Sequence, residues 1–308
     1  MTTIEPVPYV TEQRSRRSYK DRLGTLLPKI VLAPSFAITL VFVYGFILWT
    51  VYLSFTRSRI LPIYELVGFD AYYNLWSQPS WYMAIKNLAI FGVLYISFCI
   101  VIGLTIAILM DQRIRAEGVL RPIFLYPMAL SFVVTGTAWK WFLNPGLGLE
   151  KTMHNLGWES FKFDWLINTD MAIYTIVIAG VWQASGFIMA MFLAGLRGID
   201  GEIIKAAQID GAPTFAIYRR IIIPMLRPVF LSAIIVLAHM AIKSYDLVIA
   251  LTGGGPGNAT ELPSTFMYSY TFTRSQMAVG SASAVMMLMG ITAIIVPYLY
   301  SELREKRS

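Results

Sequence analysis

Long, mostly uncharged apolar stretches dominate the chain, and polar segments separate them. Six of these stretches are long enough to cross a hydrocarbon core of ~30 Å at ~1.5 Å of rise per helical residue. They are predicted at residues 30–56, 87–110, 121–140, 171–196, 229–251 and 275–301. Several lack the polar face that a helix of a soluble domain keeps. The pattern therefore predicts an all-α integral membrane protein with six transmembrane helices.

The polar segments divide the chain into two tails and one transmembrane domain. Residues 1–29 and 302–308 are predicted to be tails, and residues 30–301 form the domain, with a long polar loop at 197–228. The first tail carries a group of basic residues, namely Arg14, Arg16, Arg17, Lys20 and Arg22. The apolar stretch that follows is longer than the apolar core of a cleavable signal peptide. We therefore expect this stretch to be a retained signal anchor.

Basic residues are distributed unevenly between the two sides of the predicted membrane. With the first tail in the cytoplasm, 17 of the 25 Lys and Arg residues lie on the cytoplasmic side. Ten acidic residues lie on the cytoplasmic side and seven on the opposite side, so the strong asymmetry belongs to the basic residues. Cytoplasmic segments of membrane proteins carry such an excess of Lys and Arg. We therefore expect both termini to be cytoplasmic.

The composition agrees with a membrane protein. Charged residues make up 14% of the chain, against roughly 25% in soluble domains, and hydrophobic residues make up 56%. The net charge of +7 comes from basic residues beside apolar stretches, so we expect a lipid bilayer as partner and no nucleic acid. The single cysteine, Cys99, excludes a disulfide within the chain and a metal site built from cysteines.

The chain has no motif that predicts catalysis. It lacks the G-x-x-x-x-G-K-[ST] pattern that holds ATP phosphates and the G-x-S-x-G pattern of a nucleophile elbow. The glycine-rich run at 253–257 contains no lysine. His154 and His239, the only histidines, lack the spacing of metal ligands. We therefore expect no catalytic residue and no bound metal, and we do not expect an enzyme.

The loop at 197–228 has the clearest local pattern. Asp200 can cap a short helix with Glu202 in its first turn, where a carboxylate suits the helix dipole. Apolar residues follow at helical spacing, namely Ile203, Ile204, Ala206, Ala207 and Ile209. Gly211 is expected to break the helix, and a second amphipathic segment is expected to end at Pro224. The small residues would let a partner approach closely, although an interfacial amphipathic linker fits equally well.

This loop resembles the cytoplasmic coupling loop of ABC importer permeases, whose motif E-A-A-x-x-D-G-A precedes an apolar stretch and L-P. The matching residues are Ala206, Ala207, Asp210, Gly211, Ala212, Ile223 and Pro224. Glu202 fits the acidic residue that often precedes the motif, whereas Lys205 stands where the family has its glutamate. An ion pair of that glutamate with the ATPase would therefore have to shift to Glu202 or Asp210.

The resemblance extends over most of the chain. Landmarks of the maltose/glycerol-phosphate type of sugar permease are similar to residues 66–76, 142–149, 181–187 and 245–260. The last third looks most like glucose/mannose or α-glucoside permeases. The resemblance implies a type I ABC importer permease fold, located in a bacterial cytoplasmic membrane, that imports a carbohydrate.

The same resemblance implies a set of partners. These are a second permease subunit, a dimer of ATPase subunits and an extracytoplasmic sugar-binding protein. ATP and Mg would be bound by the ATPase subunits, and this chain would hold no cofactor. A secondary transporter or channel, and a membrane enzyme or assembly scaffold, are the alternative classes for a polytopic chain.

Two groups of residues are candidates for the substrate path, because a sugar needs polar groups and aromatic faces as it loses water. The fifth stretch contains Lys243, Tyr245 and Asp246, of which Lys243 and Asp246 are spaced to share a helix face. These two charges could equally pair with each other or lie near the outer membrane boundary.

The second group lies in the fourth stretch. It consists of Trp182, Gln183 and Phe187, which offer an amide beside aromatic rings. Because small residues surround them, helix packing is the alternative role for each of the three.

Overall fold

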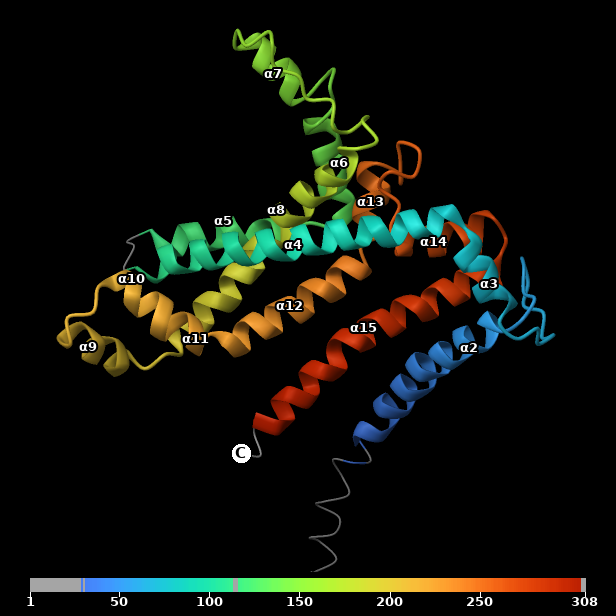
Figure 1. Ribbon diagram of the computed structural model, residues 1–308, viewed down its shortest axis with the longest axis horizontal. Coiled ribbons are helices and arrows are strands. Elements are labelled where there is room, and N and C mark those ends of the chain that lie inside the picture. The colour runs from blue at the N-terminus through green and yellow to red at the C-terminus, as the bar shows by residue number, and fades with distance from the viewer. Residues whose placement is uncertain (1–28, 30, 113–115, 306–308) are drawn as a thin grey trace, which may run out of the picture. The chain divides into compact units, whose positions relative to one another are not determined.

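The computed structural model describes residues 29, 31–112 and 116–305 (Figure 1), and every regular element in these ranges is a helix. Most of the first predicted tail, including the five basic residues named above, lies outside the described residues, as do residues 306–308. The chain divides into two compact units, residues 1–49 and 50–308.

The helices of the described residues lie both within the predicted apolar stretches and between them. Besides three π-helical turns, η1 (Leu40–Tyr44), η2 (Tyr218–Ile222) and η3 (Ser269–Thr273), they are α2 (Gly45–Ser54), α3 (Asp70–Ser77), α4 (Pro79–Asp111), α5 (Glu117–Ala129), α6 (Phe132–Phe142), α7 (Leu149–Asn155), α8 (Ala172–Arg197), α9 (Gly201–Ile209), α10 (Thr214–Ile217), α11 (Ile223–Met225), α12 (Arg227–Ile242), α13 (Asp246–Leu251), α14 (Pro263–Tyr268) and α15 (Met277–Glu305).

The described part of the first unit is the beginning of one long apolar helix. This helix continues to Ser54, and no residue of its most apolar window is buried. Phe36, Val41 and Phe46 are each more than half exposed. A helix with apolar side chains on all sides is stable only where lipid or protein covers it.

The second unit is built around the packing of α4 against α8, which α5, α12 and α13 extend. Its larger hydrophobic cluster contains side chains from α4 such as Phe91 and Cys99, and side chains from α8 such as Ile188 and Phe192. A second cluster joins α3 and the start of α4 to α14 and α15, around Leu75, Trp81, Phe266 and Tyr270. In Figure 1, α9 and α10 lie at one end of this unit, and α3 and α14 lie towards the other.

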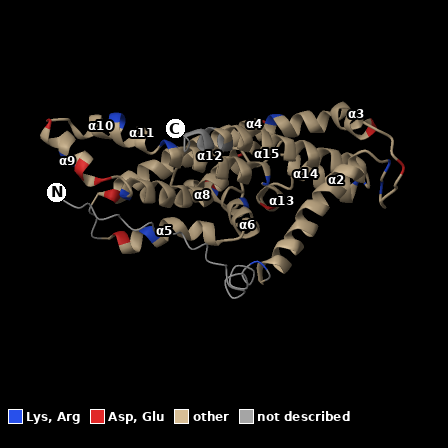
Figure 2. Cartoon of the chain, turned by 90° about the horizontal axis from the view of Figure 1, so that it is seen from below, with Lys and Arg blue, Asp and Glu red and all other residues tan. Residues whose placement is uncertain are grey.

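Four helices are long and apolar enough to cross a membrane. They are Val31–Ser54, Pro79–Asp111, Ala172–Arg197 and Met277–Pro297. Two bent pairs of helices, Glu117–Ala129 with Phe132–Phe142 and Thr214–Met225 with Arg227–Ile242, raise the number to six if each pair is one span. In Figure 2, which colours the ribbon by residue type, charged residues lie mostly towards the two ends of the second unit. The prediction of an all-α chain is confirmed, and four to six of its helical segments are long and apolar enough to be membrane spans.

The third predicted stretch, 121–140, is not a single straight helix. α5 ends at Ala129 and α6 begins at Phe132, with a bend of 98° between them. Ser131 caps α6 by accepting a hydrogen bond from the Val134 N–H at 3.3 Å. The Gln183 side-chain amide donates to the Leu130 carbonyl at 2.9 Å, which satisfies a backbone group that the bend leaves free.

The fifth predicted stretch, 229–251, was wrongly expected to be one helix. α12 ends at Ile242 and α13 begins at Asp246. The Ser264 hydroxyl donates to the Ser244 carbonyl at 2.9 Å within the break. Lys243 therefore follows the end of one helix and Asp246 begins the next, which are the positions that the helix dipole favours for these charges. Their spacing reflects two helix ends and not one helix face.

Candidate functional site

The predicted coupling loop forms a helix, a turn and a second helix. The Asp200 carboxylate accepts a hydrogen bond from the Glu202 N–H at 2.9 Å and caps α9, as the sequence predicted. Gly211 has φ +78°, a left-handed conformation that side chains other than glycine adopt at a cost. The second helix was expected to end at Pro224, but it continues to Met225, and the chain bends by 63° before α12.

One side of this coupling segment, residues 200–226, is anchored in the core. Ala207, Ile217, Ile222 and Leu226 are buried in the same hydrophobic cluster as side chains of α4 and α8. The Ala212 N–H donates to the Ala207 carbonyl at 3.0 Å and closes the turn. The segment and these two helices are therefore joined by close-packed side chains.

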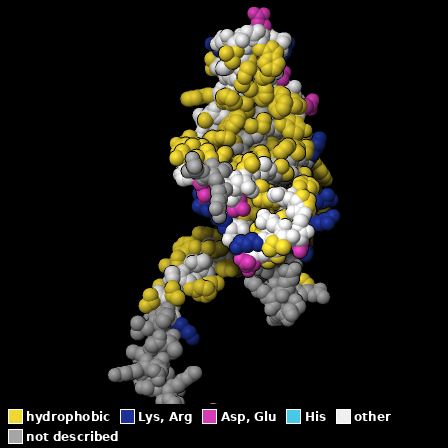
Figure 3. Space-filling model, turned by 90° about the vertical axis from the view of Figure 1, so that its left-hand side faces the viewer, with side chains coloured by type: hydrophobic (Ala, Val, Ile, Leu, Met, Phe, Trp, Pro, Cys, Tyr) yellow, Lys and Arg dark blue, Asp and Glu magenta, His cyan; other side chains and the backbone are white. Residues whose placement is uncertain are grey.

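The other side of the coupling segment is exposed. Ile209 is 86% exposed and Phe215 is 74% exposed, although both are large and apolar. Glu202, Ala206, Asp210 and Gly211 are exposed as well. Figure 3 faces this end of the unit and shows acidic and basic side chains there. The predicted apolar face of α9 is thus divided, because Ala207 is buried whereas Ile209 points away from the core.

Lys205 and Glu202 form an ion pair with 2.9 Å between Nζ and Oε1. The residue that departs from the family motif therefore engages the acidic residue of its own helix. Both side chains are exposed, so the pair adds little to stability. Ile223 and Pro224, the last matching residues, are exposed in the short helix α11.

Two polar contacts that the sequence did not predict lie near this segment. The first joins the coupling segment to the end of α4, and the second joins α8 to α5 and α4. The Gln112 side-chain amide, after α4, donates to the Tyr218 hydroxyl at 3.0 Å. The Arg197 guanidinium, at the end of α8, donates to the Glu117 carboxylate at 2.7 Å and lies 4.0 Å from Asp111. An acidic residue at the start of one helix and a basic one at the end of another are common, so no sequence signal marked this pair.

The three candidates in α8 have different surroundings. Trp182 is 40% exposed, and its ring packs edge to face with Trp139 at 5.9 Å between centroids. Gln183 is buried beneath the bend between α5 and α6, where its amide holds the Leu130 carbonyl. Phe187 is half-buried against the larger hydrophobic cluster. The structure therefore places Trp182 alone of the three at an open groove.

This groove has a volume of about 640 Å³ and lies between α4, α5 and α8. Phe98, Ile102, Phe124 and Val181 line it together with Trp182, and Ser185 is the polar residue among them. Such a lining suits apolar groups and the flat face of a sugar ring better than a cluster of hydroxyls.

The candidates in the fifth stretch lie at the break between α12 and α13. Lys243 and Asp246 are exposed, and they form no ion pair with each other in the described part of the chain. The half-buried Tyr245 ring lies 4.9 Å from Tyr268, which in turn lies 5.1 Å from Phe272. The break thus presents two charges beside a row of aromatic rings, a combination that can bind a polyhydroxylated ring.

The loop that follows α13 is held by polar contacts. The hydroxyls of Thr252 and Thr260 are 2.7 Å apart, and the Asn87 side-chain amide donates to the Glu261 carbonyl at 3.0 Å. Burial raises the pKa of the Glu261 carboxyl to about 7, and the nearby Arg274 opposes this rise. Among the described residues, no group of three or more His, Cys, Asp or Glu side chains is placed to hold a metal ion.

Known proteins with similar sequences cover nearly the whole chain. The profile of the family described as "Binding-protein-dependent transport system inner membrane component" matches residues 99–307. A probable ABC transporter permease protein of Pyrococcus horikoshii is 38% identical over 278 residues, which cover 89% of this chain and 95% of that protein. A xylose/arabinose import permease protein of Haloferax volcanii is 34% identical over 274 residues, or 88% of this chain and 86% of that protein.

A solved structure shares the fold. It is the crystal structure of a bacterial ABC transporter involved in the import of the acidic polysaccharide alginate, one chain of which matches with a TM-score of 0.78. The match covers 95% of this chain and 99% of that chain at 19% sequence identity, and at this identity it establishes the fold alone. With the family profile spanning both the coupling segment and the α12–α13 break, the chain belongs to the inner membrane components of binding-protein-dependent transport systems, the permease subunits of ABC importers.

Proposed function

We propose that this chain is one permease subunit of an ABC importer that translocates a carbohydrate delivered by an extracytoplasmic binding protein. The observation that carries the proposal is the coupling segment, whose exposed tip and buried anchor belong to one short helix-turn-helix. The relatives support a carbohydrate, because one is named a xylose/arabinose permease and another a trehalose/maltose permease.

The proposed topology has six spans in the cytoplasmic membrane, with both termini in the cytoplasm. Each bent helix pair counts as one span, and the excess of Lys and Arg sets the orientation. The coupling segment then faces the cytoplasm. The loop before α3 and the loop between α13 and α14 face the opposite side.

The proposed partners follow from this topology. A dimer of ATPase subunits, which would bind ATP and Mg, contacts the tip formed by Ile209, Gly211 and Phe215. A second permease subunit completes the translocation path. A sugar-binding protein docks on the opposite side, and a related alginate importer has been solved with its periplasmic protein.

In the proposed mechanism, closure of the ATPase subunits moves the tip of the coupling segment. Ala207, Ile217 and Ile222 transmit this displacement to α4 and α8, because they pack in the same cluster. The path then opens outward beside Trp182 and the α12–α13 break. The residues of this chain bind and position, and the ATPase subunits carry out the chemistry.

Reconstitution in proteoliposomes tests the proposal. The complete complex should take up sugar only with ATP and binding protein present. Gly211→Asp should abolish most uptake while the complex still assembles, because the side chain enters the strained turn at the contact surface. Gly118→Asp is the matched control, since Gly118 lies in the first turn of α5 with open space around it and an acidic residue suits a first turn.

Uptake that follows an ion gradient without the ATPase would instead establish a secondary transporter. That class is the second candidate, because discontinuous helices such as α12 and α13 also form its binding sites. Intact function after deletion of residues 201–220 would favour a membrane enzyme or scaffold. For the path itself, Trp182→Ala and Asp246→Ala should each change uptake kinetics without dissociating the complex, and unchanged kinetics in both would remove these residues from the path.

A further inference from the structure

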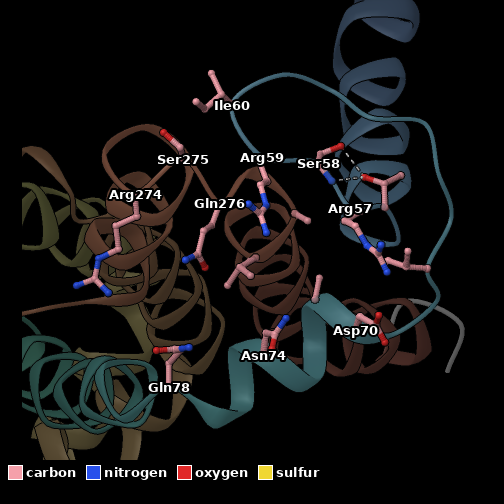
Figure 4. Close-up of a pocket in the computed structure, with 15 residues that line it drawn as sticks. Arg57, Ser58, Arg59, Ile60, Asp70, Asn74, Gln78, Arg274, Ser275 and Gln276 are labelled. Atoms are coloured by element: carbon pink, nitrogen blue, oxygen red, sulfur yellow. Dashed lines mark hydrogen bonds between the residues drawn. The ribbon is translucent and has the colours of Figure 1, made fainter.

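A polar cleft of about 650 Å³ lies at the end of the second unit opposite the coupling segment. Three segments line it: the loop that follows α2, the helix α3, and the turn that leads into α15 (Figure 4). The polar side chains that line it are Arg57, Ser58, Arg59, Asp70, Asn74, Gln78, Arg274, Ser275 and Gln276. None of these residues belongs to the proposed coupling or substrate sites.

The cleft carries an excess of positive charge. It contains three arginines against one acidic residue, Asp70. Arg57, Arg59 and Arg274 form no ion pair within the described residues. The Arg274 guanidinium lies 4.5 Å from the centre of the Tyr270 ring and donates to its hydroxyl at 2.7 Å, which leaves other N–H groups for a ligand.

The backbone that carries these arginines is held in place. The Ala278 N–H donates to the Ser58 carbonyl at 3.0 Å, and the Met277 N–H donates to the Arg59 carbonyl at 3.2 Å. The Ser58 hydroxyl lies 2.6 Å from that of Thr56 and receives the Ile63 N–H at 3.0 Å. Figure 4 shows Arg59 beside Gln276 under this loop. The arginines therefore sit on a preorganised frame, which lowers the entropy cost of binding a ligand.

The cleft lies at the level where membrane spans end. One candidate span ends at Ser54, three residues before Arg57, and another begins at Met277, three residues after Arg274. Ile60 and Leu61 are each 72% exposed, and Tyr64 is 62% exposed. Guanidinium groups beside exposed apolar and tyrosine side chains are typical of the headgroup zone of a bilayer.

We propose that this cleft binds the phosphate group of a membrane phospholipid in the leaflet opposite the coupling segment. Guanidinium groups recognise phosphate through paired, charge-assisted hydrogen bonds. Asn74 and Gln276 add neutral donors, and Ile60 and Leu61 lie against the acyl chains. The inference rests on the proposed topology for the leaflet, but the binding itself does not depend on transport.

The experiment measures phosphatidylglycerol bound to the purified complete complex by native mass spectrometry. The double variant Arg57→Gln/Arg59→Gln should bind it at least about tenfold more weakly, because charge-assisted hydrogen bonds are lost. Lys151→Gln/Lys162→Gln is the matched control: it removes the same charge from another outer loop and should retain the lipid. Arg57→Lys/Arg59→Lys should restore part of the binding, which a purely structural role would not predict.

Three results would overturn the proposal. Equal phosphatidylglycerol binding in all variants would exclude the cleft as its site. Displacement of the lipid by millimolar inorganic phosphate would assign the cleft to a soluble anion. If the arginine variants bind lipid as wild type does but dock the binding protein more weakly, the cleft binds acidic side chains of that partner. If the double variant does not assemble, Arg59→Gln alone gives the same comparison. ATP-driven uptake, measured separately, tests the proposed function independently.

Discussion

Gly186 lies where α8 crosses α5, and the two helices approach so closely there that no side chain fits between them. A Cβ atom added at Gly186 would collide with the Phe124 carbonyl oxygen and would lie 2.6 Å from its carbon and 3.3 Å from the Leu125 nitrogen. All three atoms belong to the backbone of α5, so no rotamer change can relieve the overlap. Gly186→Ala must therefore push the two helices apart.

The size of the effect follows from two opposing terms. Overpacking of a well-packed contact costs about 1–3 kcal/mol, whereas alanine in place of glycine in a helix stabilises it by about 1 kcal/mol. Gly92 in α4 has no atom within 4 Å of an added Cβ, so Gly92→Ala has only the favourable term. The favourable term is common to both variants, so they should differ by the overpacking cost of about 1–3 kcal/mol, with Gly186→Ala less stable.

The assay is the apparent midpoint of thermal unfolding of the purified complex in detergent, followed by size-exclusion chromatography with fluorescence detection. We expect Gly186→Ala to unfold several degrees below Gly92→Ala, and Gly92→Ala to unfold at or above wild type. If the two alanine variants unfold at the same temperature, α5 and α8 are not in contact at Gly186, and the bend that Gln183 supports would be placed incorrectly.

Three further predictions concern charged groups. Arg197→Gln removes the ion pair with Glu117, and we expect more ATP to be hydrolysed per sugar transported. A wild-type ratio of ATP hydrolysed to sugar transported would show that the contact has no role in coupling. Lys205→Glu replaces the ion pair with Glu202 by repulsion between two carboxylates. Because both side chains are exposed, the unfolding midpoint should stay within about 1 °C of wild type. The stimulation of the ATPase, in contrast, should change. Burial raises the pKa of Glu261 to about 7, so the contribution of its protonated carboxyl to stability is present below pH 4.5 and is lost as the pH rises through 7. Glu261→Gln should remove this loss of stability. If the unfolding midpoints of the variant and of wild type depend on pH in the same way, the prediction is contradicted.

The apolar pattern was sufficient to place the long helices. The stretch predicted at 171–196 is α8, Ala172–Arg197, and the stretch predicted at 87–110 lies within α4, Pro79–Asp111. A helix that crosses a bilayer needs about 20 predominantly apolar residues in a row, and this property is present in the local sequence. The cap at Asp200 and the turn at Gly211 were also predictable, because they depend on residues within one turn of the helix end.

The breaks in the third and fifth stretches were not predictable in this way. The Leu130 carbonyl is satisfied by Gln183, 53 residues later, and the Ser244 carbonyl by Ser264, 20 residues later. A bend inside a membrane is tolerated only when such distant partners hydrogen-bond the freed backbone groups. The apolar pattern of each stretch does not contain this information.

The sequence by itself determined where the long unbroken helices form, which segment carries the coupling motif and which family the chain resembles. The tertiary structure alone decided which residues meet: Arg197 with Glu117, Tyr218 with Gln112, and three arginines in one cleft. Helix formation depends on neighbours a few residues apart, whereas these contacts depend on how the packed helices fit together. For this reason the coupling loop could be found in the sequence, and its connections to α4 and α8 could not.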